Sequence, residues 1–156
     1  MDTEIKSLLK QYNRIYKSMD IVYHNYAKRV GLSDAAFWIL YSVAESEHPF
    51  TQRELSSEWS FPPQTVNSSL KDLAAKGIIT LEPLENNRKN KLIRLTDGGR
   101  ALIDECVLPL MQAECDGFGA LSSDECDAML SSIIKYAAEL KRRVEQIGTV
   151  GSADSK

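Results

Sequence analysis

Five polar side chains recur on one side of a helix that the sequence predicts after a turn at residues 60–63 and up to about residue 76. They are Gln64, Thr65, Asn67, Ser68 and Lys71. A merely solvated helix usually exposes Glu and Lys, whereas amides and hydroxyls lower helix propensity. Amides and hydroxyls can also exchange hydrogen bonds with base edges in the DNA major groove. We predict base contacts from Gln64 and Asn67, and base or phosphate contacts from the other three; an ordinary polar helix face is the alternative.

A basic segment follows this helix. Residues 86–95 contain no acidic side chain and four basic ones, which are Arg88, Lys89, Lys91 and Arg94. Residues 78–84 and 91–95 have the composition of two strands that pair across a polar turn at residues 85–90. Arg88 and Lys89 then lie at the tip of a hairpin, where a cation can enter a narrow minor groove. Lys91 lies further along the second strand. The alternation of side chains along that strand leaves open whether Arg94 points inward or outward. The alternative to a DNA contact is an ordinary charged loop that faces solvent.

The elements that must position these side chains are two short helices and the hairpin. Thr51 and Glu54 have the spacing of a capping box, which starts a helix that continues through Trp59. Prolines 62 and 63 are tolerated only in the first turn of the next helix, and Gly77 ends it. That helix buries one face, formed by Val66, Leu70, Leu73 and Ala74. Two helices joined by a tight turn and followed by a basic hairpin predict a winged helix-turn-helix.

Long helices flank this unit. Residues 3–29 place apolar side chains at alternating spacings of three and four, at Ile5, Leu8, Tyr12, Ile15, Met19, Val22 and Tyr26. After a second capping box at Ser122 and Glu125, spacings of three and four return, without strict alternation, at Cys126, Met129, Ile133, Tyr136, Leu140, Val144 and Ile147. Such seams are typical of helices that pack against other long helices. Between them we predict a buried helix over residues 34–47 and a helix from Thr96 to about residue 118, bent at Pro109.

Composition excludes several classes of protein. The chain has 156 residues, 43% of them hydrophobic, with no apolar run long enough to span a membrane. Its N-terminus is too acidic for a signal peptide, so we expect a cytoplasmic protein. The net charge is −3, but residues 51–100 carry eight basic and six acidic side chains, whereas residues 101–156 carry five and ten. We see no arrangement typical of an enzyme and expect no catalytic residues, cofactor or metal.

Cys106, Cys115 and Cys126 form no zinc-ligand pattern. We expect reduced, mostly structural thiols in a cytosolic chain. A redox-responsive regulator is the alternative that they leave open.

The chain resembles the MarR family of transcriptional regulators. The resemblance rests on residues 51–55 (Thr-Gln-Arg-Glu-Leu), 64–73, 76–79, 87–89 and 95–99 (Leu-Thr-Asp-Gly-Gly). It implies a mainly α fold with a winged helix-turn-helix at residues 33–99 and dimerisation helices at residues 1–32 and 100–147. Residues 148–156 are polar and small, and we predict a disordered tail there. The resemblance further implies a homodimer on double-stranded DNA, most often a repressor on a near-palindromic operator.

The chain departs from the family pattern at the wing tip, and the resemblance leaves open which ligand the regulator would bind. Where the family commonly has Asp-Arg-Arg at the wing tip, this chain has Asn87, Arg88 and Lys89, so the acid that orients the arginine is absent. A winged-helix module that binds proteins and has lost DNA binding is therefore an alternative. Family members often bind small aromatic compounds between their dimerisation and DNA-binding parts. The aromatic residues that we select for such a ligand are Tyr16, Tyr23, Phe37 and Tyr41.

Overall fold

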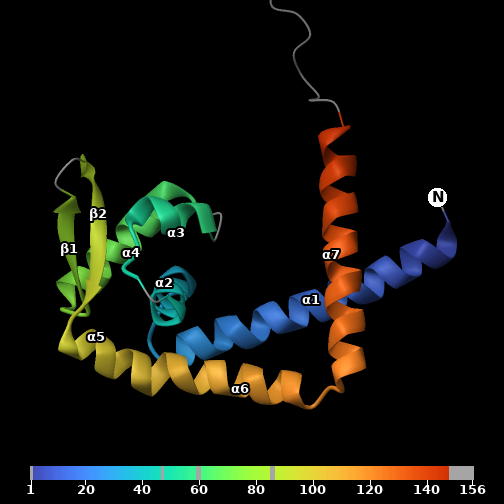
Figure 1. The fold of residues 1–156 in the computed structure, drawn as a ribbon, viewed down its shortest axis with the longest axis horizontal. Helices are drawn as coiled ribbons and strands as arrows, with labels where there is room; N and C mark the ends of the chain where they lie inside the picture. The colour runs from blue at the N-terminus through green and yellow to red at the C-terminus, as the bar shows by residue number, and fades with distance from the viewer. Residues whose placement is uncertain (1, 47, 59–60, 85–86, 148–156) are drawn as a thin grey trace, which may run out of the picture. The chain divides into compact units, whose positions relative to one another are not determined.

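The computed structural model describes residues 2–46, 48–58, 61–84 and 87–147, with residues 58, 84 and 87–90 described by their backbone alone. The chain divides into two compact units, residues 1–111 and residues 112–156. Helices account for most of both units, and the described residues form one two-stranded antiparallel sheet (Figure 1). The predicted fold class, a mainly α winged helix-turn-helix with long terminal helices, is confirmed.

The first two helices begin and end where local sequence chemistry predicts. Helix α1 (Thr3–Arg29) is capped by Asp2, whose side chain accepts a hydrogen bond from the backbone N–H of Glu4. Gly31 follows it with a φ of 76°, a conformation that favours glycine. Helix α2 (Asp34–Glu45) is capped by Ser33, and half of its residues are buried, as expected for a central helix.

The helix-turn-helix consists of α3 (Gln52–Glu58) and α4 (Pro63–Ala75). The predicted capping box forms at α3, because Thr51 N–H donates to Glu54 Oε2 and Glu54 N–H donates to Thr51 Oγ1. Hydrogen bonding from the backbone N–H and the side chain of Thr51 also holds the pKa of the Glu54 carboxyl below its usual value. Gly77 follows α4 with a φ of 69° and turns the chain toward the sheet.

The wing is a hairpin of β1 (Ile79–Leu84) and β2 (Asn87–Leu95). Ile79 pairs with Leu95 and Pro83 with Lys91, and the register then shifts before Leu84 pairs with Asn87. Strand β2 therefore begins four residues earlier than predicted, and the proposed six-residue turn at residues 85–90 is wrong. The polar composition of residues 87–90 suggested a turn, but a solvated two-stranded ribbon needs no apolar face to pair.

The core of unit 1 lies where α2, α4 and the base of the wing meet. Its fully buried side chains include Phe37, Ile39, Leu40, Leu55, Val66, Leu70, Leu73 and Val107. The predicted inner face of α4 is buried at Val66, Leu70 and Leu73, and Ala74 is partly buried against them. The opposite face of α4 is thereby fixed toward solvent, because a helix cannot rotate without exposing this apolar face.

The segment after the wing forms α5 (Asp97–Leu102), a π-helical turn (Ile103–Val107) and α6 (Leu108–Gly119). We predicted a bend at Pro109; the structure has a π turn that ends two residues before this proline. Proline has no N–H for the carbonyl four residues earlier, and a widened turn accommodates its ring. Tyr26 of α1 donates a hydrogen bond of 2.9 Å from its hydroxyl to the carbonyl of Cys106 in this turn, which joins α1 to the segment after the wing.

Unit 2 consists mainly of α7 (Ser123–Glu145). The predicted capping box forms at Ser122 and Glu125, and it lowers the pKa of the Glu125 carboxyl. None of the residues of α7 is buried within the chain. The tail predicted at residues 148–156 lies outside the described residues. Of the helices that the structure describes, none combines the length and hydropathy needed to cross a bilayer.

Candidate nucleic-acid interface

The outward face of α4 carries the polar side chains selected from the sequence. Gln64, Asn67, Ser68 and Lys71 are exposed, and Thr65 is half-buried. The hydroxyl of Ser68 donates to the carbonyl of Thr65 at 2.9 Å. In this arrangement Ser68 is left with acceptor capacity, which suits an amino group on a base better than a phosphate oxygen.

A groove of about 370 Å³ connects α4 with the neighbouring elements. Its lining residues are Gln52, Pro63, Gln64, Asn67, Lys71, Leu81 and Lys91. The structure thus brings both amides selected on α4 together with two lysines, one from α4 and one from the wing. The sequence did not lead us to select Gln52 as a groove residue. The signal that could have found it is its position in the first turn of α3, directly after the N-cap Thr51.

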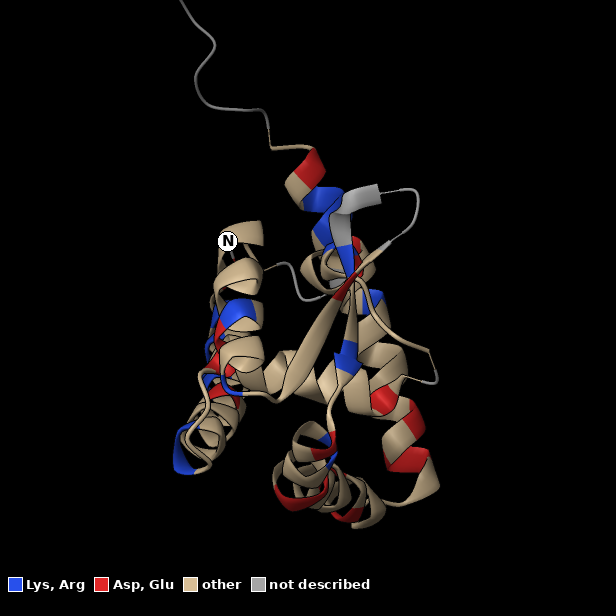
Figure 2. Ribbon diagram, turned by 90° about the vertical axis from the view of Figure 1, so that its left-hand side faces the viewer, with Lys and Arg blue, Asp and Glu red and all other residues tan. Residues whose placement is uncertain are grey.

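Ion pairs decide which charges near this groove are available to a ligand. Asp72 of α4 pairs with Lys76 at 2.8 Å, and Glu82 of β1 pairs with Arg94 of β2 at 2.6 Å. The strand alternation did not predict whether the Arg94 side chain points inward or outward. In the structure it is exposed, and its charge is balanced by Glu82. Figure 2 shows that α4 and the two strands carry both signs of charge. Among the described residues of this surface, Lys71 and Lys91 are cations that have no carboxylate in ion-pair range.

The predicted wing-tip contacts lie outside what the structure describes. The backbone of Asn87, Arg88 and Lys89 belongs to β2, and their side chains are not described. Their roles stay predictions.

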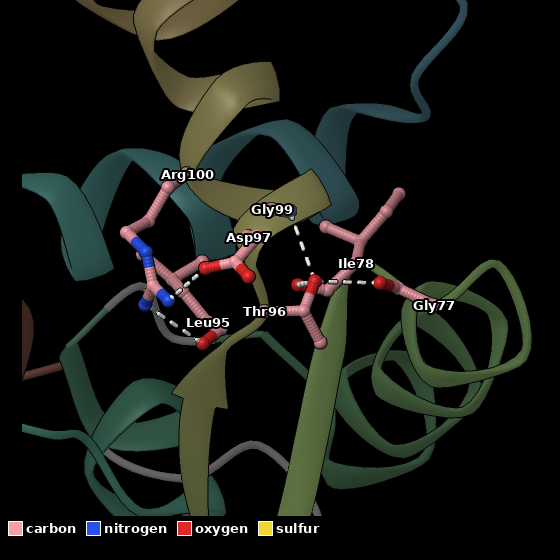
Figure 3. Close-up of polar contacts among 7 residues, drawn as sticks. All are labelled: Gly77, Ile78, Leu95, Thr96, Asp97, Gly99 and Arg100. Carbon is pink, nitrogen blue, oxygen red and sulfur yellow. Dashed lines mark hydrogen bonds and ion pairs between the residues drawn. The ribbon is translucent and has the colours of Figure 1, made fainter.

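A polar junction holds the wing against the end of α4 (Figure 3). The Thr96 hydroxyl donates to the Gly77 carbonyl oxygen at 2.6 Å and also lies 3.0 Å from the Ile78 carbonyl oxygen, within donating distance, and it accepts from the N–H of Gly99. The N–H of Thr96 also donates to the Ile78 carbonyl. This junction sets the orientation of the hairpin relative to α4, because Gly77 ends the α4 segment and Ile78 leads into β1.

Arg100 completes the junction from α5. One guanidinium nitrogen donates to the carbonyl of Leu95 at 3.1 Å, and another pairs with Asp97. Thr96 caps α5 as predicted. The last residue of β2 is therefore held by a side chain from the helix that follows it.

The residues selected for an aromatic ligand lie in different environments. Phe37 is fully buried in the core, Tyr41 is partly buried against Phe37 and Trp38, and Tyr16 is exposed on α1. Tyr23 lines a second cleft of unit 1, of about 430 Å³, which α1 and α2 form together with Phe61.

The cysteines differ in exposure. Cys106 is buried, and burial raises the pKa of its thiol, so this sulfur stays in the protonated and less nucleophilic form. Cys115 is exposed and Cys126 is half-buried. The thiol with the least access to oxidants is the one in the π turn.

Comparisons with known proteins find one family model and several solved structures that are similar to this chain. The model of the MarR family matches residues 30–89. NMB1585, a MarR family regulator from Neisseria meningitidis, superposes with a TM-score of 0.76 at 22% identity over 90% of this chain and 99% of its own. Sco3205 from Streptomyces coelicolor, solved in complex with DNA, gives 0.74 at 16% identity over 99% and 95%. MepR from S. aureus, solved as a MepR–DNA complex, gives 0.67 at 20% identity over 84% and 96%.

At these identities the structural likeness establishes the fold, and the family model covers the segment from the start of α2 to the first residues of β2. Residues 30–89 therefore match the model of the MarR family, and the chain as a whole has the fold of the solved MarR family regulators.

Proposed function

We propose that this chain is a transcriptional regulator that binds double-stranded DNA with sequence specificity. The observation that carries the proposal is the groove in which Gln64, Asn67 and Lys71 of α4 meet Lys91 of the wing. Amides that can read bases beside cations that can bind phosphates are the two parts that a specific DNA contact requires. Sco3205 and MepR share this fold and were solved in complex with DNA, which supports the proposal that this chain binds DNA.

We further propose that the protein acts as a homodimer. In unit 1, α1 exposes an apolar stripe that includes Leu8, Ile15 and Val22, and in unit 2, α7 exposes one that includes Ile133 and Val144. Soluble monomers rarely leave contiguous apolar stripes of this length in water. Two copies would present two α4 helices to DNA, so the expected operator is near-palindromic, with half-sites about one helical turn apart.

The regulatory outcome that we propose is repression that a small aromatic ligand relieves. Selection of bound duplexes from a random pool tests the core of the proposal, since it reveals both DNA binding and operator symmetry. Fluorescence anisotropy at two salt concentrations then measures counterion release. Absence of salt-sensitive binding to any duplex would favour the alternative, a winged-helix module that binds proteins.

Lys71→Ala is expected to weaken operator binding by about tenfold and to reduce the salt slope by about one. Lys71 lies in the groove, and its ammonium group has no carboxylate in ion-pair range among the described residues. Lys76→Ala is the matched control on the same helix, because Lys76 already pairs with Asp72 at 2.8 Å. Anisotropy titrations over a salt series measure both slopes, and equal losses for the two variants would remove Lys71 from the interface.

Ile15→Glu is expected to convert the dimer to a monomer in light scattering after size exclusion. Ile15 is 61% exposed on the apolar stripe of α1, and a buried unpaired carboxylate at a dimer interface costs several kcal/mol (about 3 or more). Lys10→Glu introduces the same side chain on the polar face of α1 and should leave the dimer intact. A monomeric wild-type protein, or a dimeric Ile15→Glu variant, would contradict the assigned interface.

A further inference from the structure

The groove beside α4 holds a third amide side chain, to which the proposed function assigns no role. Gln52, the first residue of α3, lines the same groove of about 370 Å³ as Gln64 and Asn67 of α4. Within the described residues, no hydrogen bond of the chain occupies any of these three amide groups. Three amides with unused donors and acceptors therefore converge on one groove from two different helices.

Backbone contacts fix the position of Gln52. Thr51, directly before it, is held in its capping box and also forms a β-bridge with Leu92 of β2. One residue earlier, the carbonyl of Phe50 accepts a hydrogen bond of 2.8 Å from the N–H of Ile93. The start of α3 is therefore tied to the wing, and Gln52 reaches the groove from a backbone that is already ordered. A preorganised contact of this kind loses less conformational freedom when a ligand binds.

The groove has separate groups for phosphates and for bases. Lys71 and Lys91 are its cations, and neither has a carboxylate in ion-pair range among the described residues. Phosphate oxygens favour these ammonium groups, because hydrogen bonds that involve charged groups are about twice as strong as neutral ones. An amide instead offers a donor next to an acceptor, the pair that matches N6 and N7 of adenine in the major groove. Neutral Gln52 is therefore better suited to a base edge than to a phosphate.

We propose that Gln52 is a further specificity-determining residue, which reads an adenine at a position of the half-site that neither Gln64 nor Asn67 reads. Part of the sequence preference then comes from α3, outside the helix that carries the other two amides. The inference rests on the proposed DNA-binding function, which it extends by one base pair in each half-site. Since Gln52 belongs to a different helix, its removal leaves the amides of α4 in place.

Selection of duplexes from a random pool by the full-length wild type, Gln52→Ala and Gln52→Glu tests the proposal. The wild type is expected to select an A·T pair at one position of each half-site that Gln52→Ala leaves unspecified, with the other positions unchanged. Gln52→Glu should prefer cytosine at that position, because a carboxylate accepts from cytosine N4. Glutamate keeps the size of the glutamine side chain, so this second readout does not depend on tolerance of the smaller alanine.

Fluorescence anisotropy gives the size of the effect. The wild type should bind the selected operator about tenfold more tightly than a duplex in which this one pair is replaced in both half-sites, whereas Gln52→Ala should distinguish the two by less than about twofold. A uniform loss by Gln52→Ala on both duplexes, with the preference retained, would show a phosphate contact and overturn the proposal.

Ser57→Glu is the control for the added charge. Ser57 is exposed on α3 and does not line the groove, so this variant adds the same carboxylate to the same helix and should leave every base preference unchanged. A change to cytosine in Ser57→Glu as well would show a general effect of charge and contradict a direct contact from Gln52.

The behaviour of the wild type separates this inference from the function on which it rests. If the wild type selects no duplex, the DNA-binding function fails and the role of Gln52 fails with it. If the wild type selects an operator and Gln52→Ala keeps all of its base preferences, DNA binding stands and only the role of Gln52 fails.

Discussion

Replacement of Gly99 by alanine is expected to destabilise the protein by about 3 kcal/mol or more, which lowers the melting temperature by roughly 10 °C. A Cβ atom at this position would lie 2.0 Å from the Ile78 carbonyl oxygen, 3.1 Å from the Ile78 carbonyl carbon and 3.2 Å from Leu95 Cδ2. The closest neighbour is backbone and cannot rotate away. Either β1 moves, or α5 separates from it and the hydrogen bonds of Thr96 at this junction are lost.

Gly98→Ala is the matched control for this prediction. It lies next to Gly99 in the same helix, but an added Cβ would meet only Thr96 Oγ1 at 3.7 Å and the Gly77 carbonyl at 3.8 Å, which are ordinary contacts. Alanine has a higher helix propensity than glycine, so this variant should match the wild type or gain up to about 1 kcal/mol. Thermal and urea unfolding at equal protomer concentration measure both variants. Similar stabilities for the two would refute the close approach at Gly99.

Asn67→Ala is expected to change which DNA sequences are bound. Asn67 is exposed on α4 and lines the groove, and an amide that binds a base in bidentate fashion contributes about 1–3 kcal/mol of discrimination. The variant should lose about tenfold or more in affinity for the selected operator and little for unrelated duplexes. Asn13→Ala, the same change on the exposed surface of α1, should leave both affinities unchanged.

Arg88→Ala provides the contrast at the wing tip. A cation in the minor groove or on phosphates contributes to every duplex, so this variant should weaken all of them by a similar factor and reduce the salt slope by about one. Anisotropy with the operator and with a scrambled duplex measures both variants. Equal losses for Asn67→Ala and Arg88→Ala on every duplex would contradict this division between base and backbone contacts.

Helix ends and helix faces were the features that the sequence predicted best. Thr51, Thr96 and Ser122 cap the helices that they were expected to cap. Caps depend on hydrogen bonds within three residues, and the inner face of α4 depends on a 3.6-residue period. Both are local, so neither needed knowledge of the rest of the chain.

The wing was harder to predict, because its limits depend on pairing between strands. Residues 87–90 have a turn-like composition, yet they extend β2 after the register shift beside Pro83. Whether Arg94 offers a free charge likewise depended on Glu82, twelve residues earlier, across the hairpin. The composition of one segment does not predict which residues of the opposite strand pair with it.

The sequence by itself determined the order of the helices, their caps, and the polar character of the α4 face that carries Gln64 and Asn67. Only the tertiary structure decided that Lys71 and Lys91 share one groove with Gln52 and that Gly99 touches the backbone of Ile78. The first set follows from interactions within one or two helical turns. The second joins residues up to 39 positions apart, as with Gln52 and Lys91, and packing of the core sets the distances between them.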